Sequence, residues 1–382
     1  MSLQRLQNKL AELESEGRLR GLREVASPQG RILRQGGREY LNFSSNDYLG
    51  LAASPELKAA FARGIERWGT GSGASRLVNG SLKPFHDLER ALAEFKGTEA
   101  ALLFNSGYHA NLGALSCLLG EGDLVFSDEL NHASMIDGLR LSKAERLLYR
   151  HNDLNDLREK MVRARAQGKN GQFLIAAETV FSMDGDRAPL DGLLALAAEL
   201  DAWLYLDEAH ATGIFGPSGA GCFEAFRRDP RGKDRVIQMG TLGKALGCFG
   251  AYVAGSRVLI DYLVNRARPF IYTTALPPAL AEAALEALRL VGAKPELRQG
   301  LWRNIEQVQA AGRPLESPIL PIIVGSSEKA LQASRALFEQ GLWVSAIRPP
   351  TVAEGSARLR VTLSAFHEPA DLVRLLRALE GF

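Results

Sequence analysis

The feature that most constrains the fold is a regular alternation of short apolar runs and helical patterns between about residues 100 and 255. The apolar runs read AALLF, DLVFSD, ERLLYRH, QFLIAAE, AWLYLD, RVIQMG and FGAYVAG. Strands separated by about 10 to 15 helical residues need crossover connections, which produce a mostly parallel sheet with helices on both faces. We therefore predict an α/β fold built on a mostly parallel, seven-stranded sheet.

Segments on either side of this region complete the predicted domain organisation. Leucines recur at helical spacing from Leu3 to Leu13, which indicates an amphipathic helix packed on a larger body. Beyond PFIYTTALPPA, helical patterns and the runs SPILPIIVG, LWVSAIRPP and ARLRVTLS are typical of a smaller α/β domain. We predict an N-terminal helix and short strand over residues 1–45, a large α/β domain over residues 46–275 and a small C-terminal α/β domain over residues 276–382.

Composition argues against several classes of protein. The 46 basic and 44 acidic residues give a net charge of +2, which does not favour a nucleic acid or a membrane surface as partner. The three cysteines lie far apart, and no His/Cys cluster has metal-ligand spacing, so we expect a reduced compartment and no metal site. No run reaches the roughly 18 to 20 apolar residues of a membrane helix, and the N-terminus lacks the apolar core of a signal peptide. We predict a cytoplasmic protein.

Polar and glycine-rich segments follow five of the predicted strands. They read NSGYH, DELNHAS, ETVFSMDGD, DEAHATG and GTLGKALG. In open α/β sheets, ligands bind beyond the carboxyl ends of the strands. We expect these five segments to converge on one crevice.

Two residues in these segments, Lys244 and Asp207, indicate a cofactor. Lys244 lies in a glycine-flanked turn, where loss of solvation favours a neutral amine that can form a Schiff base; a solvated surface lysine is the alternative. Asp207 ends the run LYLD, and a carboxylate at the edge of a core needs a cation. The ring nitrogen of pyridoxal phosphate supplies such a cation, whereas a helix N-cap is the alternative for Asp207.

Further polar residues match the remaining groups of this cofactor. Gly107 and Tyr108 begin a predicted helix, where unpaired N–H groups and the helix dipole favour a phosphate. His132 has the chemistry to stack on the pyridine ring, and Ser182 and His210 have groups that bind its phenolic oxygen. Each of these residues is also compatible with an ordinary turn or with a buried structural histidine.

Nine motifs, in family order between about residues 20 and 365, resemble those of the α-oxoamine synthases, which are pyridoxal phosphate enzymes of fold type I. The motifs are FSSNDYLGL, GSGASRLVNG, FNSGYHAN, NHASMIDG, ETVFSMDGD, LDEAHATGIFG, GTLGKALG, RPFIYTTALPP and AIRPPTV. The resemblance implies an acyltransferase that condenses an amino acid with an acyl thioester and releases carbon dioxide. It also implies a homodimer whose sites lie at the subunit interface.

The resemblance assigns catalytic roles to Lys244, His132 and Asp207. Lys244 would form the internal aldimine and remove the Cα proton of the substrate. His132 would stack on the ring, and Asp207 would hold the pyridinium. His210 and Ser182 would bind the phenolic oxygen.

The phosphate site is implied in the same way. The amides of Gly107 and Tyr108, together with the Thr241 hydroxyl, would hold the phosphate. Thr273 or Thr274 would reach the same phosphate from the other subunit.

The resemblance also implies substrate-binding residues. Arg348 in AIRPPTV matches the arginine that binds the amino acid carboxylate, with Thr351 beside it, and Asn46 matches a further site position. If the acyl substrate is a pimeloyl thioester, its chain ends in a carboxylate, for which the sequence offers Arg20 or Arg23. Alignment on LNFSSNDYLG favours Arg20, and the alternative is that both arginines lie on a solvated helix end.

Alternatives for the reaction remain open. LDEAHATG, ETVFSMDGD and IYTTALPP favour condensation of L-alanine with a pimeloyl thioester, carried by coenzyme A or a carrier protein, over condensation of glycine with acetyl-CoA. A non-catalytic pyridoxal phosphate sensor would be expected to carry a DNA-binding helix-turn-helix, and the sequence shows no such unit. An aminotransferase would share Lys244 and Asp207 but would react with keto acids.

Overall fold

The computed structural model describes residues 3–232 and 234–382, which form two compact units. The larger unit comprises residues 51–182 and 186–298, and the smaller unit comprises residues 3–50, 183–185 and 299–382. Helix α11 (Pro295–Ala310) begins in the larger unit and continues into the smaller one.

A seven-stranded sheet forms the centre of the larger unit. Its strands are β3 (Ala100–Phe104), β4 (Leu124–Asp128), β5 (Glu145–Tyr149), β6 (Phe173–Glu178), β7 (Ala202–Asp207), β8 (Val236–Thr241) and β9 (Ala251–Gly255). Their order in the sheet is β3-β9-β8-β7-β6-β4-β5, and β9 runs in the direction opposite to that of the other six strands. All seven strands coincide with runs predicted from the sequence, so the predicted sheet is confirmed.

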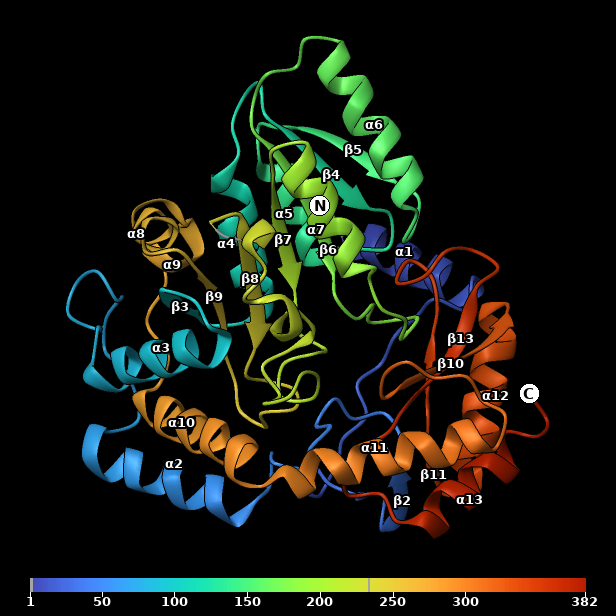
Figure 1. Ribbon diagram of the computed structural model, residues 1–382. Helices are drawn as coiled ribbons and strands as arrows, with labels where there is room; N and C mark the ends of the chain where they lie inside the picture. The colour runs from blue at the N-terminus through green and yellow to red at the C-terminus, as the bar shows by residue number, and fades with distance from the viewer. Residues whose placement is uncertain (1–2, 233) are drawn as a thin grey trace. The chain divides into compact units, whose positions relative to one another are not determined.

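Helices cover both faces of this sheet (Figure 1). The helices that lie wholly in the larger unit are α2 (Pro55–Trp68), α3 (Lys83–Lys96), α4 (Gly107–Leu118), α5 (Ala133–Leu141), α6 (Leu154–Ala166), α7 (Leu190–Glu199), α8 (Arg257–Arg266), α9 (Arg268–Ile271) and α10 (Pro278–Ala293), with 3₁₀ turns η1 (Cys222–Phe226) and η2 (Pro230–Gly232). Helices α4, α5 and α8 share one buried apolar cluster with the strands, whereas α3, α6 and α7 contact the strands outside that cluster. Burial on both faces explains the continuous apolar runs, because each buried Leu, Ile or Phe contributes about 1.5–3 kcal/mol.

Helices α2 and α10 lie side by side, and α10 also packs against α3 (Figure 1). Gly64 allows the close approach, because a Cβ atom there would lie 2.7 Å from Cα of Ala279. Helix α10 therefore belongs to the larger unit, although the sequence predicts that the small domain begins at residue 276. The packing that assigns α10 to this unit is long-range and leaves no signal in the local sequence pattern.

Two three-stranded sheets build the smaller unit. Their strands are β1 (Ile32–Gln35), β2 (Arg38–Asn42), β10 (Ile319–Gly325), β11 (Leu342–Trp343), β12 (Ser345–Ile347) and β13 (Ala357–Thr362), in the orders β1-β2-β11 and β10-β13-β12. The run LWVSAI thus supplies two strands in different sheets. Because β2 pairs with β11, the N-terminal segment belongs to the same unit as the C-terminal region.

Three further helices belong to the smaller unit: α1 (Leu3–Ser15), α12 (Ser327–Glu339) and α13 (Pro369–Ala378). Helix α12 packs against β11, β12 and β13. Helix α1 lies where the leucine spacing predicts it, but it buries none of its residues within the described chain. Across the described residues, every helix is too short or too polar to cross a membrane.

Candidate active site

The carboxyl ends of β3, β4, β6, β7 and β8 lie at one edge of the larger unit's sheet, because these strands run parallel to one another. Strand pairing places Glu178, the last residue of β6, beside Asp207, the last residue of β7. Met239 of β8 is the neighbour of Asp207 on the other side. The polar segments that follow these strands therefore begin at the same edge, as the sequence predicts.

Asp207 is buried at the end of β7, with 4% of its surface exposed. Its Oδ2 atom accepts a hydrogen bond from Asn111 Nδ2 at 2.8 Å, and its Oδ1 atom accepts one from the Ala209 amide at 2.9 Å. Among the described residues, no lysine, arginine or histidine forms an ion pair with this carboxylate. The segment that follows forms turns, which rules out the helix N-cap alternative. The edge of the sheet thus carries a buried acid that complements a cation.

Asn111, on α4, orients Asp207 and was not predicted from the sequence. Its amide also donates to Ser134 Oγ at 2.9 Å, and its Oδ1 atom accepts from the Tyr205 hydroxyl at 2.8 Å. The side chain is completely buried. Its sequence signal was an amide side chain four positions after Gly107, beside the apolar run of the same helix, since a buried polar group of this kind needs specific partners.

Lys244 lies in the turn that connects β8 to β9, and its Nζ atom is 2.7 Å from His210 Nε2. The Gly243 amide donates to Thr241 Oγ1 at 3.1 Å, and the Thr241 hydroxyl donates to the Gly250 carbonyl at 3.1 Å. These bonds hold the turn in shape. The hydroxyl hydrogen of Thr241 is already used within the turn, so Thr241 would donate to a phosphate only after its hydroxyl rotates.

His132 is the N-cap residue of α5, and its Nδ1 atom accepts a hydrogen bond from the Ser134 amide at 3.2 Å. Burial lowers the pKa of His132; the charge of Asp207 partly offsets this effect, and the charge of Lys244 adds to it. The imidazole is therefore neutral at neutral pH. A neutral ring at this edge is suited to stacking on an aromatic ligand.

Glu178 is a second buried acid beside Asp207. Burial, followed by the charge of Asp207, raises the pKa of Glu178 to about 8. Its Oε2 atom accepts from the Ser182 amide at 3.2 Å, which ties the turn that carries Ser182 to β6. Its Oε1 atom is buried and has no hydrogen-bond partner in the described part of the chain. A buried oxygen without a partner is unusual in proteins and is consistent with a binding site for a polar ligand.

Gly107 and Tyr108 begin helix α4 directly after β3. Ser106 is the N-cap residue, and its Oγ atom accepts from the His109 amide at 3.2 Å. Within the described residues, the amides of Gly107 and Tyr108 have no protein acceptor. Two unpaired amides at a helix N-terminus favour a phosphate.

Thr273 and Thr274 contact the same segment of their own chain. Asn105 Nδ2 donates to Thr273 Oγ1 at 3.1 Å and to the Thr274 carbonyl at 3.0 Å. The two threonines therefore lie close to the residues that precede the start of α4. That either of them reaches a phosphate held by another subunit stays a prediction.

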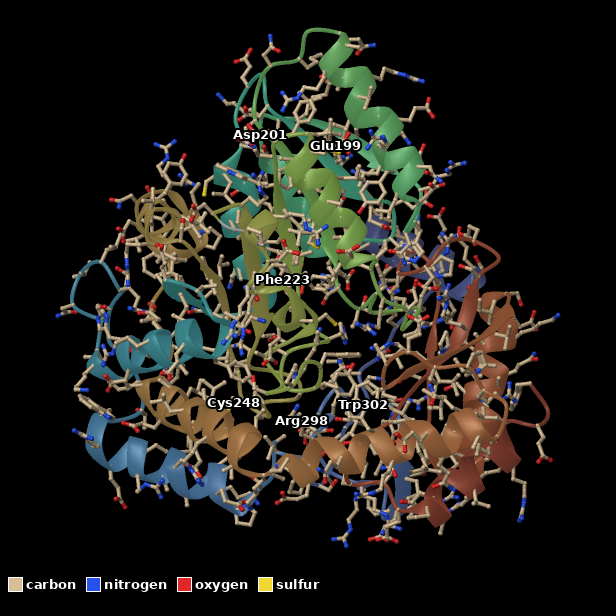
Figure 2. The ribbon with its side chains drawn as sticks, viewed as in Figure 1. Glu199, Asp201, Phe223, Cys248, Arg298 and Trp302 are labelled. Atoms are coloured by element: carbon tan, nitrogen blue, oxygen red, sulfur yellow. The ribbon has the colours of Figure 1, made fainter. Side chains whose placement is uncertain are left out.

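A fully buried ion pair lies directly next to Asp207 in the chain. Lys96 Nζ contacts Glu208 Oε2 and the Ala220 carbonyl, and neither charged side chain is exposed. Glu208 Oε1 accepts from the amide of Phe223, which is labelled in Figure 2, at 2.8 Å. The pair therefore links the end of α3 to the segment that follows Asp207 and to η1.

The groups at this edge fit pyridoxal phosphate. The buried carboxylate of Asp207 complements a protonated ring nitrogen, and the amides of Gly107 and Tyr108 complement a phosphate. Lys244 supplies an amine for an aldehyde. These four residues lie at the end of β7 or just after β3 and β8, and their functional roles stay predictions.

Three of the predicted substrate-binding residues come together in the smaller unit. Arg20 Nη2 donates to Thr351 Oγ1 at 3.2 Å, and Arg348 Nη1 donates to the Gly17 carbonyl. Burial lowers the pKa of Arg348, and the charge of Arg20 lowers it further. Neither arginine forms an ion pair with an acid among the residues that the structure describes. Two neighbouring cations without counter-ions favour anionic ligands.

The two remaining candidates have other contacts. The Arg23 guanidinium lies 4.9 Å from the centre of the Phe338 ring and so makes a cation–π contact. Asn46 Oδ1 accepts from Arg360 Nη1 at 3.2 Å and not from the three residues described above. Of the two arginines that the sequence offers for an acyl carboxylate, the geometry favours Arg20.

Comparison with known proteins identifies the family. A family model described as aminotransferase class I and II matches residues 38–379. The 8-amino-7-oxononanoate synthase of Anaeromyxobacter dehalogenans is 50% identical over 378 residues, covering 97% of this chain and 93% of the relative. That of Methylococcus capsulatus is 49% identical, covering 97% and 96%. The chain belongs to the class I and II aminotransferase family, in its α-oxoamine synthase branch.

Solved structures of other α-oxoamine synthases share the fold of this one. A structure of serine palmitoyltransferase with its PLP internal aldimine has a TM-score of 0.90 and 30% identity, covering 99% of this chain and 97% of that chain. The 8-amino-7-oxononanoate synthase of Francisella tularensis has a TM-score of 0.75 and 32% identity, covering 89% and 96%. The fold type I architecture that the sequence predicts for this α-oxoamine synthase is confirmed.

Proposed function

We propose that this chain is an 8-amino-7-oxononanoate synthase, a pyridoxal 5'-phosphate enzyme that condenses L-alanine with a pimeloyl thioester in biotin biosynthesis. Curated relatives with this name match almost the whole chain at about half identity. The observation that carries the chemistry is the buried Asp207 carboxylate, which has no cationic partner among the described residues and shares one sheet edge with the Lys244 turn.

Residues of the larger unit have separate roles in binding the cofactor and in proton transfer. Bound pyridoxal phosphate supplies a ring that withdraws electrons from the amino acid Cα. Asp207 keeps a proton on the ring nitrogen, and Asn111 fixes the orientation of that carboxylate through the 2.8 Å hydrogen bond. Lys244 removes and returns the proton at the substrate Cα, and His210 lies within hydrogen-bond distance of its amine. His132 presents a neutral ring for stacking.

The residues of the smaller unit favour this pair of substrates. L-alanine and the pimeloyl chain each carry a carboxylate, and Arg348 and Arg20 each lack an acidic partner within the described chain. We assign Arg348 to the amino acid carboxylate and Arg20, beside Thr351, to the acyl carboxylate. In the competing reaction, glycine carries a carboxylate but the acetyl group of acetyl-CoA does not, so only one of the two arginines, Arg348 and Arg20, would have a carboxylate to bind. The acyl carrier is coenzyme A or a carrier protein.

The protein acts in the cytoplasm as a homodimer in this proposal, with Thr273 or Thr274 completing the phosphate site of the other subunit. Helix α1 supports a partner, because its leucines remain exposed, from 39% at Leu13 to 77% at Leu3. An amphipathic helix without a buried face within its own chain can bury that face against a second copy.

A product assay tests the proposed reaction. Purified protein with pyridoxal phosphate is given L-alanine and pimeloyl-CoA, or glycine and acetyl-CoA, and the products are identified by mass spectrometry. We expect 8-amino-7-oxononanoate, carbon dioxide and free coenzyme A from the first pair. Preferential turnover of the second pair would overturn the substrate assignment.

An absorbance measurement tests whether Lys244 forms a Schiff base with pyridoxal phosphate. Protein saturated with pyridoxal phosphate is expected to absorb visible light, and Lys244→Ala is expected to remove that absorbance and the activity. Lys58→Ala, on the exposed side of α2, is the matched control and should leave both unchanged. Equal spectra for the wild type and Lys244→Ala would remove Lys244 from its proposed role.

A further inference from the structure

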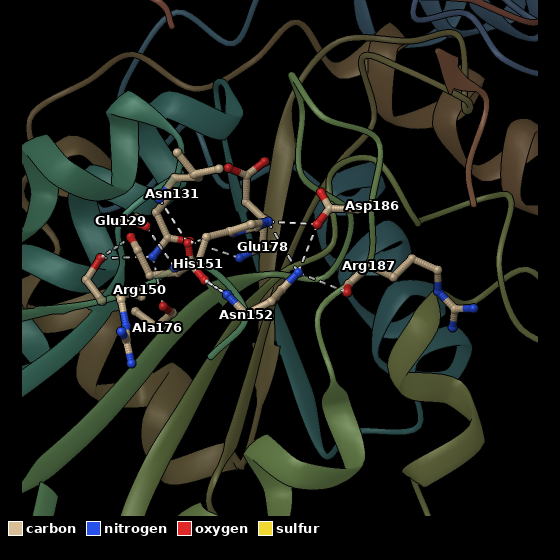
Figure 3. Close-up of polar contacts among 12 residues, drawn as sticks. Glu129, Asn131, Arg150, His151, Asn152, Ala176, Glu178, Asp186 and Arg187 are labelled. Carbon is tan, nitrogen blue, oxygen red and sulfur yellow. Dashed lines mark hydrogen bonds and ion pairs between the residues drawn. The ribbon is translucent and has the colours of Figure 1, made fainter. Parts of the chain in front are cut away.

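His151, two residues beyond β5, lies between two carboxylates. Its Nδ1 atom is 3.0 Å from Asp128 Oδ1. Its Nε2 atom is 2.7 Å from Asp186 Oδ2, a contact that Figure 3 marks with a dashed line. Burial lowers the pKa of His151, but hydrogen bonds to Asp128 and Asp186 outweigh it and raise the pKa to about 10. With both ring nitrogens donating to carboxylates, the ring is an imidazolium at neutral pH. We call Asp128, His151 and Asp186 the His151 bridge.

The first arm of the His151 bridge holds the turn that carries His132. Asp128 ends β4, and besides His151 it accepts a hydrogen bond from the Leu130 amide at 2.9 Å. Asn131 continues the turn and accepts from the Glu178 amide at 3.0 Å. His132 follows at once in the chain. The position of His132 therefore depends on a turn that Asp128 and Asn131 fix at both of its ends.

The second arm holds the segment that carries Ser182. The Phe181 amide donates to the Asp186 carbonyl at 3.0 Å, which brings Asp186 back beside the residue that precedes Ser182. The Phe181 ring packs perpendicular to the His151 ring, with 4.4 Å between the ring centres. Asn152 Nδ2 also donates to Asp186 Oδ2 at 2.9 Å, as Figure 3 shows. The His151–Asp186 pair, the ring contact and the Asn152 bond thus join this segment to the residues after β5.

We propose that His151 is a positioning residue that ties the turn carrying His132 to the segment carrying Ser182. Strands β4 and β6 are neighbours in the sheet, and the bond from the Glu178 amide to Asn131 is an uncharged connection between the loops that follow them. His151 supplies a charged connection between them from the end of β5. Its importance for cofactor binding rests on the proposed roles of His132 and Ser182.

Replacement of His151 by phenylalanine and by glutamine tests the proposal. Phenylalanine keeps the ring contact with Phe181 but removes both polar bonds, whereas glutamine keeps one donor group. We expect His151→Phe to weaken pyridoxal phosphate binding by about tenfold or more, because small misplacements of site residues have large effects. His151→Gln should recover part of the loss. Titration of each apoprotein with pyridoxal phosphate measures its cofactor dissociation constant. Visible circular dichroism reports the orientation of the bound ring.

His367→Phe is the matched control. His367 is a buried histidine of the smaller unit that accepts from the Ser364 amide at 3.1 Å and stacks on Phe43 with 4.3 Å between ring centres. We expect its replacement to lower the melting temperature but to leave the cofactor dissociation constant and the circular dichroism unchanged. Unchanged binding and dichroism in both His151 variants would overturn the proposal, even if their melting temperatures fall.

A double-mutant cycle with Asp186→Asn tests whether the bridge acts as one unit. Asp186 is partly exposed, so its replacement is compatible with folding. The effects of His151→Phe and Asp186→Asn on the cofactor dissociation constant should be less than additive, because each breaks the contact between His151 and Asp186. Full additivity would overturn the proposal. These readouts need no turnover, so a failure of the proposed reaction in the wild type is distinguished from a failure of the bridge.

Discussion

At the scale of single residues, the Asp207 carboxylate decides what the sheet edge can bind. A buried acid without a positive partner is costly unless a ligand provides the charge. The hydrogen bonds from Asn111 and Ala209 orient the carboxylate, and both donors are uncharged. Asp207 was predictable because an acid at the end of an apolar strand needs an explanation. Asn111 was not, because its partner on β7 lies far away in the sequence.

Replacing Asp207 with asparagine should preserve the shape of the site and remove its charge. We expect kcat to fall by about 100-fold or more, because a charge that stabilises the reacting centre is lost. Cofactor should still bind through the amides of Gly107 and Tyr108. Steady-state kinetics and cofactor titration check the two parts. Asp191→Asn, at a side chain that is 73% exposed, is the control and should keep wild-type activity.

The pKa of His151 predicts a window of pH-dependent stability. Because folding raises this pKa from 6.5 to about 10, the stabilisation from His151 is complete below pH 6.5 and is lost as the pH rises toward 10. The difference in unfolding free energy between the wild type and His151→Gln should therefore shrink across this window. Urea unfolding at a series of pH values measures it. A difference that is constant from pH 6.5 to 10 would contradict the assignment of a charged His151.

His367 provides the opposite case. Burial lowers its pKa from 6.5 to about 4, so the folded chain resists protonation of this ring. Its contribution to stability is therefore present above pH 6.5 and is lost as the pH falls toward 4. Replacing His367 should change the acid side of the stability profile and leave the alkaline side as it is in the wild type.

At the scale of helices and strands, the Lys96–Glu208 pair joins the end of α3 to the segment after β7. Lys96→Met should destabilise the fold by about 3–5 kcal/mol, because Glu208 would remain as a buried charge without its partner. Chemical denaturation measures the loss. In the double variant with Glu208→Gln, we expect part of the stability to return, since the amide is neutral and can still accept from the Phe223 amide. A double variant as unstable as the sum of the single ones would contradict this coupling.

How well each element was predicted depends on where its determinants lie. The seven strands of the large sheet were predictable because a strand that is buried on both faces consists of a continuous run of apolar residues. The run LWVSAI carries no local sign of its division, because β11 and β12 are defined by their different partners, β2 and β13. Helix α10 likewise shows an ordinary helical pattern, and its assignment to the larger unit depends on α2 and α3.

At the scale of the whole molecule, the order of motifs along the chain predicted the family and the proposed cofactor, whereas contacts between subunits require a second copy. Thr273 and Thr274 illustrate the difference. Within one chain they contact Asn105, which explains their conformation. Whether they also complete a neighbouring site depends on an interface that a single sequence does not describe.

Mixing two inactive variants tests the shared site. Lys244→Ala lacks the amine, and the double replacement of Thr273 and Thr274 by alanine lacks the threonines. If the threonines act on the partner's phosphate, mixed dimers regain one intact site, and activity should return to about a quarter of the wild-type level after random exchange of subunits in a twofold dimer. Activity assays before and after exchange measure it, with mass by light scattering as the control for dimers. No recovery despite exchange would place the threonines in their own subunit's site.

The antiparallel course of β9 has a consequence for Lys244. The segment from Leu242 to Gly250 leaves β8 and returns into its neighbour β9, and the Leu242 amide donates to the Gly250 carbonyl at 2.9 Å across its base. The Cys248 amide also donates to the Leu242 carbonyl at 2.8 Å, so two backbone hydrogen bonds close the base of this turn, unlike a loop that leads away into a helix. We therefore expect the Lys244 amine to change position by rotation about the four carbon–carbon bonds of its side chain rather than by movement of the backbone.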